Sequence, residues 1–251
     1  MAFEFFFKKN GITFSFKQSI SIVLSDISEN PSSLFIIIQR DSKGTQKQFY
    51  LTTFNLPLLS ANFNNASNWT SGVVPGVNDD VVIPSNGVVN ITGDLTVKSM
   101  SIAAGASIIS DGSITGSISY IRNIPTTNWY LISSPVASQD KDAFVAASNV
   151  ATGTQASNLG FANYDNTTEA WSYYQSGTNG SGSFTQGQGH SIKLNAAGAV
   201  VFTGTFNDAD ATFTLSYNNN GLNLIGNPYL ASVSVKEMLE EVNIETLLSE
   251  K

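Results

Sequence analysis

The chain has 251 residues, of which 41% are hydrophobic and 12% are charged, and its net charge is −7. Because this charge would repel a polyanion, we expect no nucleic-acid partner. The absence of cysteine excludes disulfides, thiolate metal sites and cysteine nucleophiles. No apolar run reaches the ~18 residues of a membrane-spanning helix, so no transmembrane segment is expected.

Residues 1–60 show the pattern of short strands separated by turns. The apolar runs 3–7 and 12–16 flank Asn10-Gly11, and an Asn-Gly pair is a strong signal for a hairpin turn. Further strand-like runs lie at 20–24, 34–39 and 48–53. We predict that residues 1–60 form a β-rich N-terminal segment, which is a candidate anchor.

Residues 61–118 contain short apolar runs separated by turn residues such as Asp111-Gly112. The run at 95–102 changes phase, with Leu95 and Val97 inward and then Met100 and Ile102. Strands this short cannot bury a face alone, so they would be stable if successive rungs stack, as in a β-helix or β-roll. A conventional sandwich with the following segment is the competing interpretation. We predict a rung-like β segment over 61–118.

Residues 119–234 mix strands with glycine loops, which indicates a β-sandwich-like domain. The run at 129–132 is expected to be a strand core, and 140–149 a short helix. After residue 234 the apolar residues follow the spacing of a helix. Positions i, i+3, i+4 and i+7 are occupied by Val235, Met238, Leu239 and Val242. We therefore predict an all-β fold with one C-terminal helix within 235–251. This helix would cap an open end or edge of the β domain; docking on a continuation of the chain or on another subunit is the alternative.

The sequence contains no recognisable catalytic motif. It has no nucleophile elbow, phosphate-binding loop or zinc-protease motif, and its one histidine, His190, cannot form a two-histidine metal site. A catalytic triad around His190 would need partners that spacing does not reveal; a loop or strand position without chemistry is the alternative. We predict that the chain is not an enzyme and holds no cofactor.

Three carboxylate pairs stand in turn-like stretches, at Asp79/Asp80, Asp140/Asp142 and Asp208/Asp210. A glycosidase needs two carboxylates at a controlled separation, but aspartate is also common in turns because it binds nearby backbone amides. We favour the turn role for all three pairs. Asp208 and Asp210 are weak candidates for calcium, because the segment lacks the glycine and the distal glutamate of an EF-hand loop.

Aromatic residues give the better indication of a ligand site. Trp171, Tyr173 and Tyr174 stand beside a glycine-rich loop at 176–189 and could stack on a sugar or hold a protein partner. Core packing is the alternative, since alternation in a strand places Trp171 and Tyr173 on one face and Tyr174 on the other. The predicted partner is a protein or glycan surface, and homo-oligomerisation is left open.

Three phrases resemble segments of large surface and secreted β-rich proteins of Bacteroidota, of the kind exported by type IX secretion. They are NWTSGVVPGVNDDVVIP at 68–84, NWYLISSPV at 128–136 and GLNLIGNPY at 221–229, and the resemblance covers about residues 62–250. It implies a structural or adhesive role at the cell surface or outside the cell, with no catalytic residues to carry over.

The chain departs from that family at both ends. Its start does not have the order of a signal peptide, and it stops about twenty residues after the last phrase, where such proteins usually continue. Either the chain is a fragment of a larger surface protein, or it is a spike or fibre component of a phage infecting such bacteria. A polysaccharide-binding or polysaccharide-acting module is the second alternative.

Overall fold

In the computed structural model, β-strands are the main regular structure of the described residues, which also include one α-helix. The described residues are 2–8, 11–14, 21–24, 35–39, 59–154, 157–175, 180–216 and 222–233. They form five sheets, so the predicted all-β class is confirmed. The strand predicted at 48–53 and the helix predicted within 235–251 lie outside the described residues.

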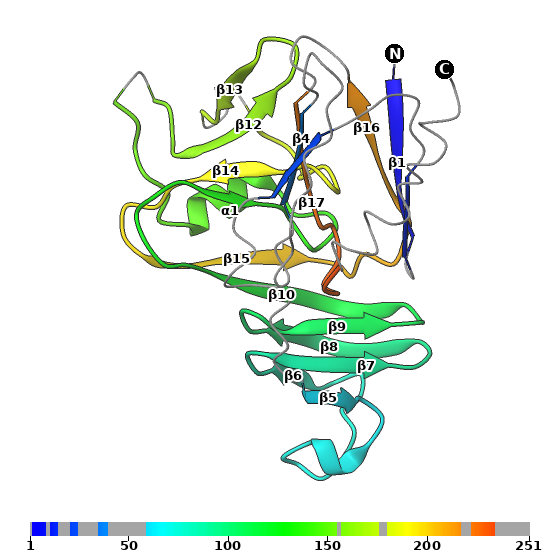
Figure 1. The fold of residues 1–251 in the computed structure, drawn as a ribbon. Helices are drawn as coiled ribbons and strands as arrows, with labels where there is room; N and C mark the ends of the chain where they lie inside the picture. The colour runs from blue at the N-terminus through cyan, green and yellow to red at the C-terminus, as the bar shows by residue number, and fades with distance from the viewer. Residues whose placement is uncertain are drawn as a thin grey trace, which may run out of the picture.

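The N-terminal strands pair with each other and with strands far along the chain. β1 and β2 are antiparallel, as the predicted hairpin requires, and Lys8 pairs with Gly11 at the start of β2; residues 9 and 10 between the strands lie outside the described residues. β3 and β4 form a second antiparallel pair. β1 also pairs with β16, and β4 with β17 (Figure 1). The bounds are β1 (Ala2–Lys8), β2 (Gly11–Phe14), β3 (Ser21–Leu24), β4 (Phe35–Gln39), β16 (Ala211–Ser216) and β17 (Asn223–Gly226).

Successive strands of residues 59–124 alternate between two sheets, and within each sheet these strands are parallel (Figure 1). We call residues 59–124 the coil, in the sense of a chain that winds through successive turns. β5, β7 and β9 form one sheet, and β6, β8 and β10 form the other. β15 (Gly198–Gly204) then adds to β10 in the antiparallel direction. The predicted β-helix remains our interpretation of this alternation. The bounds are β5 (Leu59–Asn62), η1 (Ala66–Asn68), β6 (Asp80–Ile83), β7 (Gly87–Ile91), β8 (Leu95–Ile102), β9 (Ser107–Ser110) and β10 (Ile114–Ile124).

Rows of apolar side chains fill the interior of the coil. Val81, Met100 and Ile118 are register partners on β6, β8 and β10, and all three are buried. The facing sheet contributes Val89 and Ile108, which are paired on β7 and β9 and are also buried. The buried apolar residues of these short strands therefore come together in shared rows, which no single strand could form alone.

A β-bulge in β8 explains the change of phase in the 95–102 pattern. The register with β10 shifts between Thr115 and Ser117, where β8 carries one residue more than its partner. Val97 and Met100 are three residues apart, yet both are buried. The extra residue of the bulge is what allows both side chains to face the interior.

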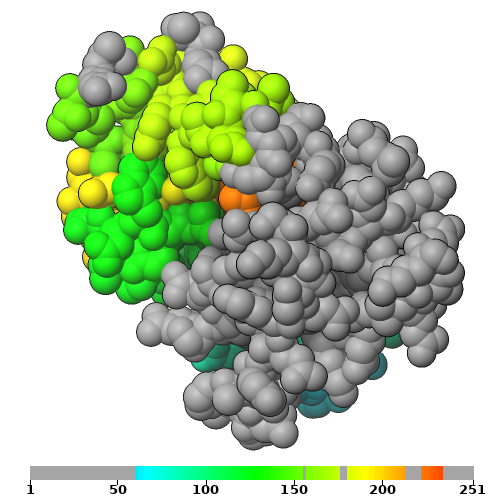
Figure 2. Space-filling model, turned by 45° about the horizontal axis from the view of Figure 1, so that its top comes forward, coloured from blue at the N-terminus to red at the C-terminus, as the bar shows by residue number. Residues whose placement is uncertain are grey.

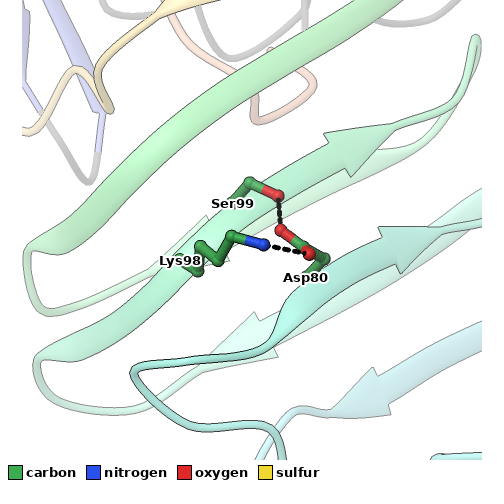
Figure 3. Close-up of polar contacts among 3 residues, drawn as sticks. All are labelled: Asp80, Lys98 and Ser99. Carbon is green, nitrogen blue, oxygen red and sulfur yellow. Dashed lines mark hydrogen bonds and ion pairs between the residues drawn. The ribbon is translucent and has the colours of Figure 1, made fainter.

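Lys98, within this bulge, forms an ion pair on the outside of the coil. Its Nζ lies 2.7 Å from a carboxylate oxygen of Asp80 on β6, and the Ser99 hydroxyl donates to the other oxygen at 2.5 Å (Figure 3). The hydrogen bonds from Lys98 and Ser99 hold the pKa of Asp80 below its usual value. Because both charged side chains are well exposed, water screens this ion pair strongly.

The remaining strands form a four-stranded antiparallel sheet in the order β11-β14-β12-β13. Helix α1 lies between β14 and β15 in the view of Figure 1. The residues of this sheet and of α1, coloured green to yellow, lie together on one side of the molecule in Figure 2. The bounds are β11 (Tyr130–Ile132), α1 (Lys141–Ala147), β12 (Phe161–Asp165), β13 (Ala170–Tyr173) and β14 (His190–Ile192).

Four buried phenylalanines, called the Phe144 cluster, join these elements. Phe144 of α1 stacks on Phe202 of β15 at a ring-centroid distance of 4.8 Å. It also meets the edge of Phe184 at 5.3 Å and lies 5.9 Å from Phe161 of β12. Two β layers therefore contact each other through α1.

Replacing Asp140, the N-cap of α1, with alanine is expected to lower the free energy of unfolding by about 1 kcal/mol. The Asp140 carboxylate accepts a hydrogen bond from the backbone N–H of Ala143 at 2.8 Å. Asp140→Asn is the matched control, because an asparagine side chain caps a helix about as well. Urea unfolding curves measure both variants, and an alanine variant as stable as the asparagine variant would contradict the capping role.

Candidate functional site

Trp171 and Tyr173 lie on β13, which is the last strand in the order of the four-stranded sheet, and Tyr174 directly follows this strand. Trp171 is the register partner of Tyr164 on β12, and the two rings meet edge to face with their centroids 5.5 Å apart. Trp171 is 40% exposed, and Tyr173, two residues on, shares its face of the sheet. Tyr174 is 3% exposed, and its hydroxyl donates to the Asp142 carboxylate. Tyr174 therefore packs inside, while Trp171 and Tyr173 stay at the surface.

A pocket of about 400 Å³ opens beside Tyr173. Trp129 forms a second aromatic wall, with its ring centroid 6.0 Å from that of Tyr173 and the two planes tilted by 59°. The strand core expected at 129–132 needs a correction here: β11 begins at Tyr130, and Trp129 is 45% exposed. Polar lining is provided by Thr152, Thr154, Asn158 and Lys193.

Backbone hydrogen bonds join three other residues that line the pocket. Ala151 N–H donates to the carbonyl of Lys193 at 2.8 Å, Lys193 N–H donates to Gly160 at 2.7 Å, and Gly160 N–H donates back to Ala151 at 2.6 Å. A Cβ atom at Gly160 would lie 2.7 Å from the Lys193 carbonyl oxygen, so only glycine allows this approach. The pocket is thus formed by the fold itself, as binding sites for small ligands usually are.

The side-chain amide of Asn158 is oriented by its neighbour. Gln175 donates from Nε2 to the Asn158 Oδ1 at 2.5 Å. Within the described residues, the NH2 group of Asn158 has no partner of its own. It is therefore a donor that a ligand in the pocket could use, together with the exposed hydroxyls of Thr152 and Thr154.

Lys193 is the one charged residue among those lining the pocket. Its side chain is half-buried, and its ammonium has no hydrogen-bond or ion-pair partner in the part of the chain that the structure describes. The pocket thus combines two aromatic rings, neutral donors and one cation. This set can bind a small polar ring and offers a positive charge to it.

His190 is buried in the aromatic core, away from any reactive partner among the described residues. It is 1% exposed, stacks on Phe161 at 5.0 Å and meets the edge of Phe184 at 5.0 Å. Neither ring nitrogen has a hydrogen-bond partner among the described residues. Burial, with a smaller effect from Lys141, lowers the pKa of His190 to about 3, so the ring is neutral at pH 7.

The paired aspartates have structural partners. The Asp79 carboxylate accepts from Gly76 N–H at 2.8 Å, Asp140 caps α1, and Asp208 accepts from the Ser113 hydroxyl. The described residues include no group of three or more His, Asp or Glu side chains that could hold a metal ion. The calcium assignment for Asp208 and Asp210 stays a prediction.

Comparison with protein-family models, curated proteins and solved structures finds no match to this chain. The resemblance to surface proteins of Bacteroidota therefore stays a prediction. Among the described residues, no helix is long and apolar enough to cross a membrane.

Proposed function

We propose that this chain is a non-catalytic adhesive module that binds carbohydrate through the Trp129–Tyr173 pocket. The observation that carries the proposal is the pair of aromatic rings that line a pocket together with hydroxyl and amide groups. Aromatic faces pack against the C–H faces of sugar rings, while neutral donors and acceptors fix the orientation of the sugar hydroxyls.

The size and stiffness of the pocket suit a saccharide. A volume of about 400 Å³ lies within the usual range for sites that hold small ligands. The hydrogen-bonded wall at Ala151, Gly160 and Lys193 supports a pocket that needs no rearrangement before binding, which limits the entropic cost of association.

An adhesive role without chemistry is supported by the surroundings of the acidic residues. No carboxylate is among the residues that line the pocket, and Asp80, Asp140 and Asp142 each bind a partner within the fold. Together with the resemblance to Bacteroidota surface proteins, this favours a module that works at a cell surface or outside the cell.

Binding to a panel of soluble neutral and acidic oligosaccharides, followed by tryptophan fluorescence and calorimetry, tests the proposal. Trp129→Ala is expected to weaken binding of any saccharide ligand at least about tenfold, because a large aromatic ring that packs on the ligand contributes strongly to affinity. Trp171→Ala is the matched control: this tryptophan is similarly exposed but does not line the pocket. Its affinity is expected to change less than about twofold.

Two results would count against carbohydrate binding at this pocket. One is the absence of saturable binding to every saccharide of the panel. The other is an equal loss of affinity in the Trp129 and Trp171 variants, which would place the contact elsewhere on the sheet.

A further inference from the structure

The charge of the pocket differs from that of the whole chain. The chain carries a net charge of −7, yet the residues lining the pocket include Lys193 and no carboxylate. Lys193 as a residue is half-buried, and its ammonium has no hydrogen-bond or ion-pair partner in the described part of the chain. A ligand with a negative charge would give the Lys193 ammonium an ion-pair partner.

We propose that the pocket selects a singly charged acidic sugar, a uronate or a sugar sulfate ester, whose anionic group contacts Lys193. This inference rests on the proposed carbohydrate binding and specifies the ligand class of the same site. In this arrangement the sugar ring lies against Trp129 and Tyr173, and its hydroxyls meet Thr152 and Asn158. One cation matches one negative charge, which favours a monoanionic unit over a phosphorylated one.

The neutral part and the charged part of the site should act separately. Trp129 and Tyr173 contact the ring, so their contribution is the same for an acidic sugar and its neutral counterpart. Lys193 contributes when the charge is present, and a hydrogen bond between charged groups is stronger than one between neutral groups. We therefore expect an acidic ligand to bind about tenfold more tightly than its neutral counterpart.

The test compares oligogalacturonate with its methyl ester, which keeps the ring and removes the charge. The wild-type chain is expected to prefer the acid about tenfold, and Lys193→Gln is expected to lose that preference while it binds the ester within about twofold of wild type. Sulfated galactan oligosaccharides and their desulfated forms are the second arm. A preference confined to one arm assigns the anion to carboxylate or to sulfate, and either result supports the proposal.

Lys98→Gln is the matched control, because it removes one positive charge from the coil, outside the residues that line the pocket. It should keep the full preference for the acid, and the preference of the wild type should decline as salt rises from 50 to 500 mM.

A preference that persists in Lys193→Gln, or that is lost equally in Lys98→Gln, would overturn the role of Lys193. Binding of neutral saccharides without an acid preference would overturn this inference and leave the proposed function standing. If the chain binds no saccharide, both the proposed function and this inference are wrong.

Discussion

Phe144→Ala is expected to lower the free energy of unfolding by about 3–5 kcal/mol, the largest effect of any single change considered. Phe144 stands at the centre of the Phe144 cluster and contacts Phe202, Phe184 and Phe161, which belong to different parts of the fold. Removing its ring leaves a cavity that these three side chains cannot fill, because each is fixed by a different element. The loss therefore includes both the transfer of the ring and the cavity.

Urea unfolding followed by tryptophan fluorescence measures this loss. Phe144→Leu should be markedly less destabilising, because it keeps most of the apolar volume. Val201→Ala is the surface control: Val201 is 42% exposed on β15, and its change should stay within about 0.5 kcal/mol. If Phe144→Ala and Val201→Ala cost the same, the cluster does not join the layers.

Acidification from pH 7 to pH 4.5 is expected to remove about 2–3 kcal/mol of stability through His190 alone. Burial lowers the pKa of His190 to about 3, whereas the unfolded chain has the ordinary value of 6.5. Between these two values the unfolded state binds a proton that the folded state does not bind. Stability from the neutral ring is therefore complete above pH 6.5 and is lost progressively as the pH falls toward 3.

His190→Phe isolates this effect from the titration of the carboxylates. The new ring can stack between Phe161 and Phe184, and no described hydrogen bond is lost, since neither His190 nitrogen has a partner among the described residues. The variant is expected to match or exceed the wild type at pH 7 and to exceed it by a further 2–3 kcal/mol at pH 4.5, roughly. Because His190 is the one histidine of the chain, parallel stability curves for both proteins would refute this assignment.

Local patterns in the sequence predicted local structure well. The hairpin predicted from the runs at 3–7 and 12–16 is present as the antiparallel pair of β1 and β2, and the phase change at 95–102 marks the bulge in β8. Such features depend on residues that are close in the sequence and on a single pair of strands, so local sequence patterns can predict them. Long-range pairings have no such signal: nothing local indicates that β1 joins β16 or that β4 joins β17.

The candidate site was predictable in part for the same reason. Alternation along β13 indicated that Trp171 and Tyr173 share a face, and this depends on one strand. Trp129 and Lys193 could not be added from the sequence, because they approach Tyr173 through the pairing of separate strands and the 151–160 loop. An apolar run that includes Trp129 favoured burial, although its ring stands just before β11 and faces the pocket.

The coil has a nearly constant step. Val81 pairs with Met100 and Met100 with Ile118, so equivalent positions recur after 19 and 18 residues. Each turn contacts the turns before and after it, which means that duplication of one such unit would bury the same rows and present the same edges to its neighbours. The molecule would lengthen by one strand spacing, about 4.8 Å, and the Trp129–Tyr173 pocket would be carried outward unchanged. If the pocket binds a ligand as proposed, the number of turns would set the reach of the module and the pocket lining would set its specificity, so the two could evolve independently.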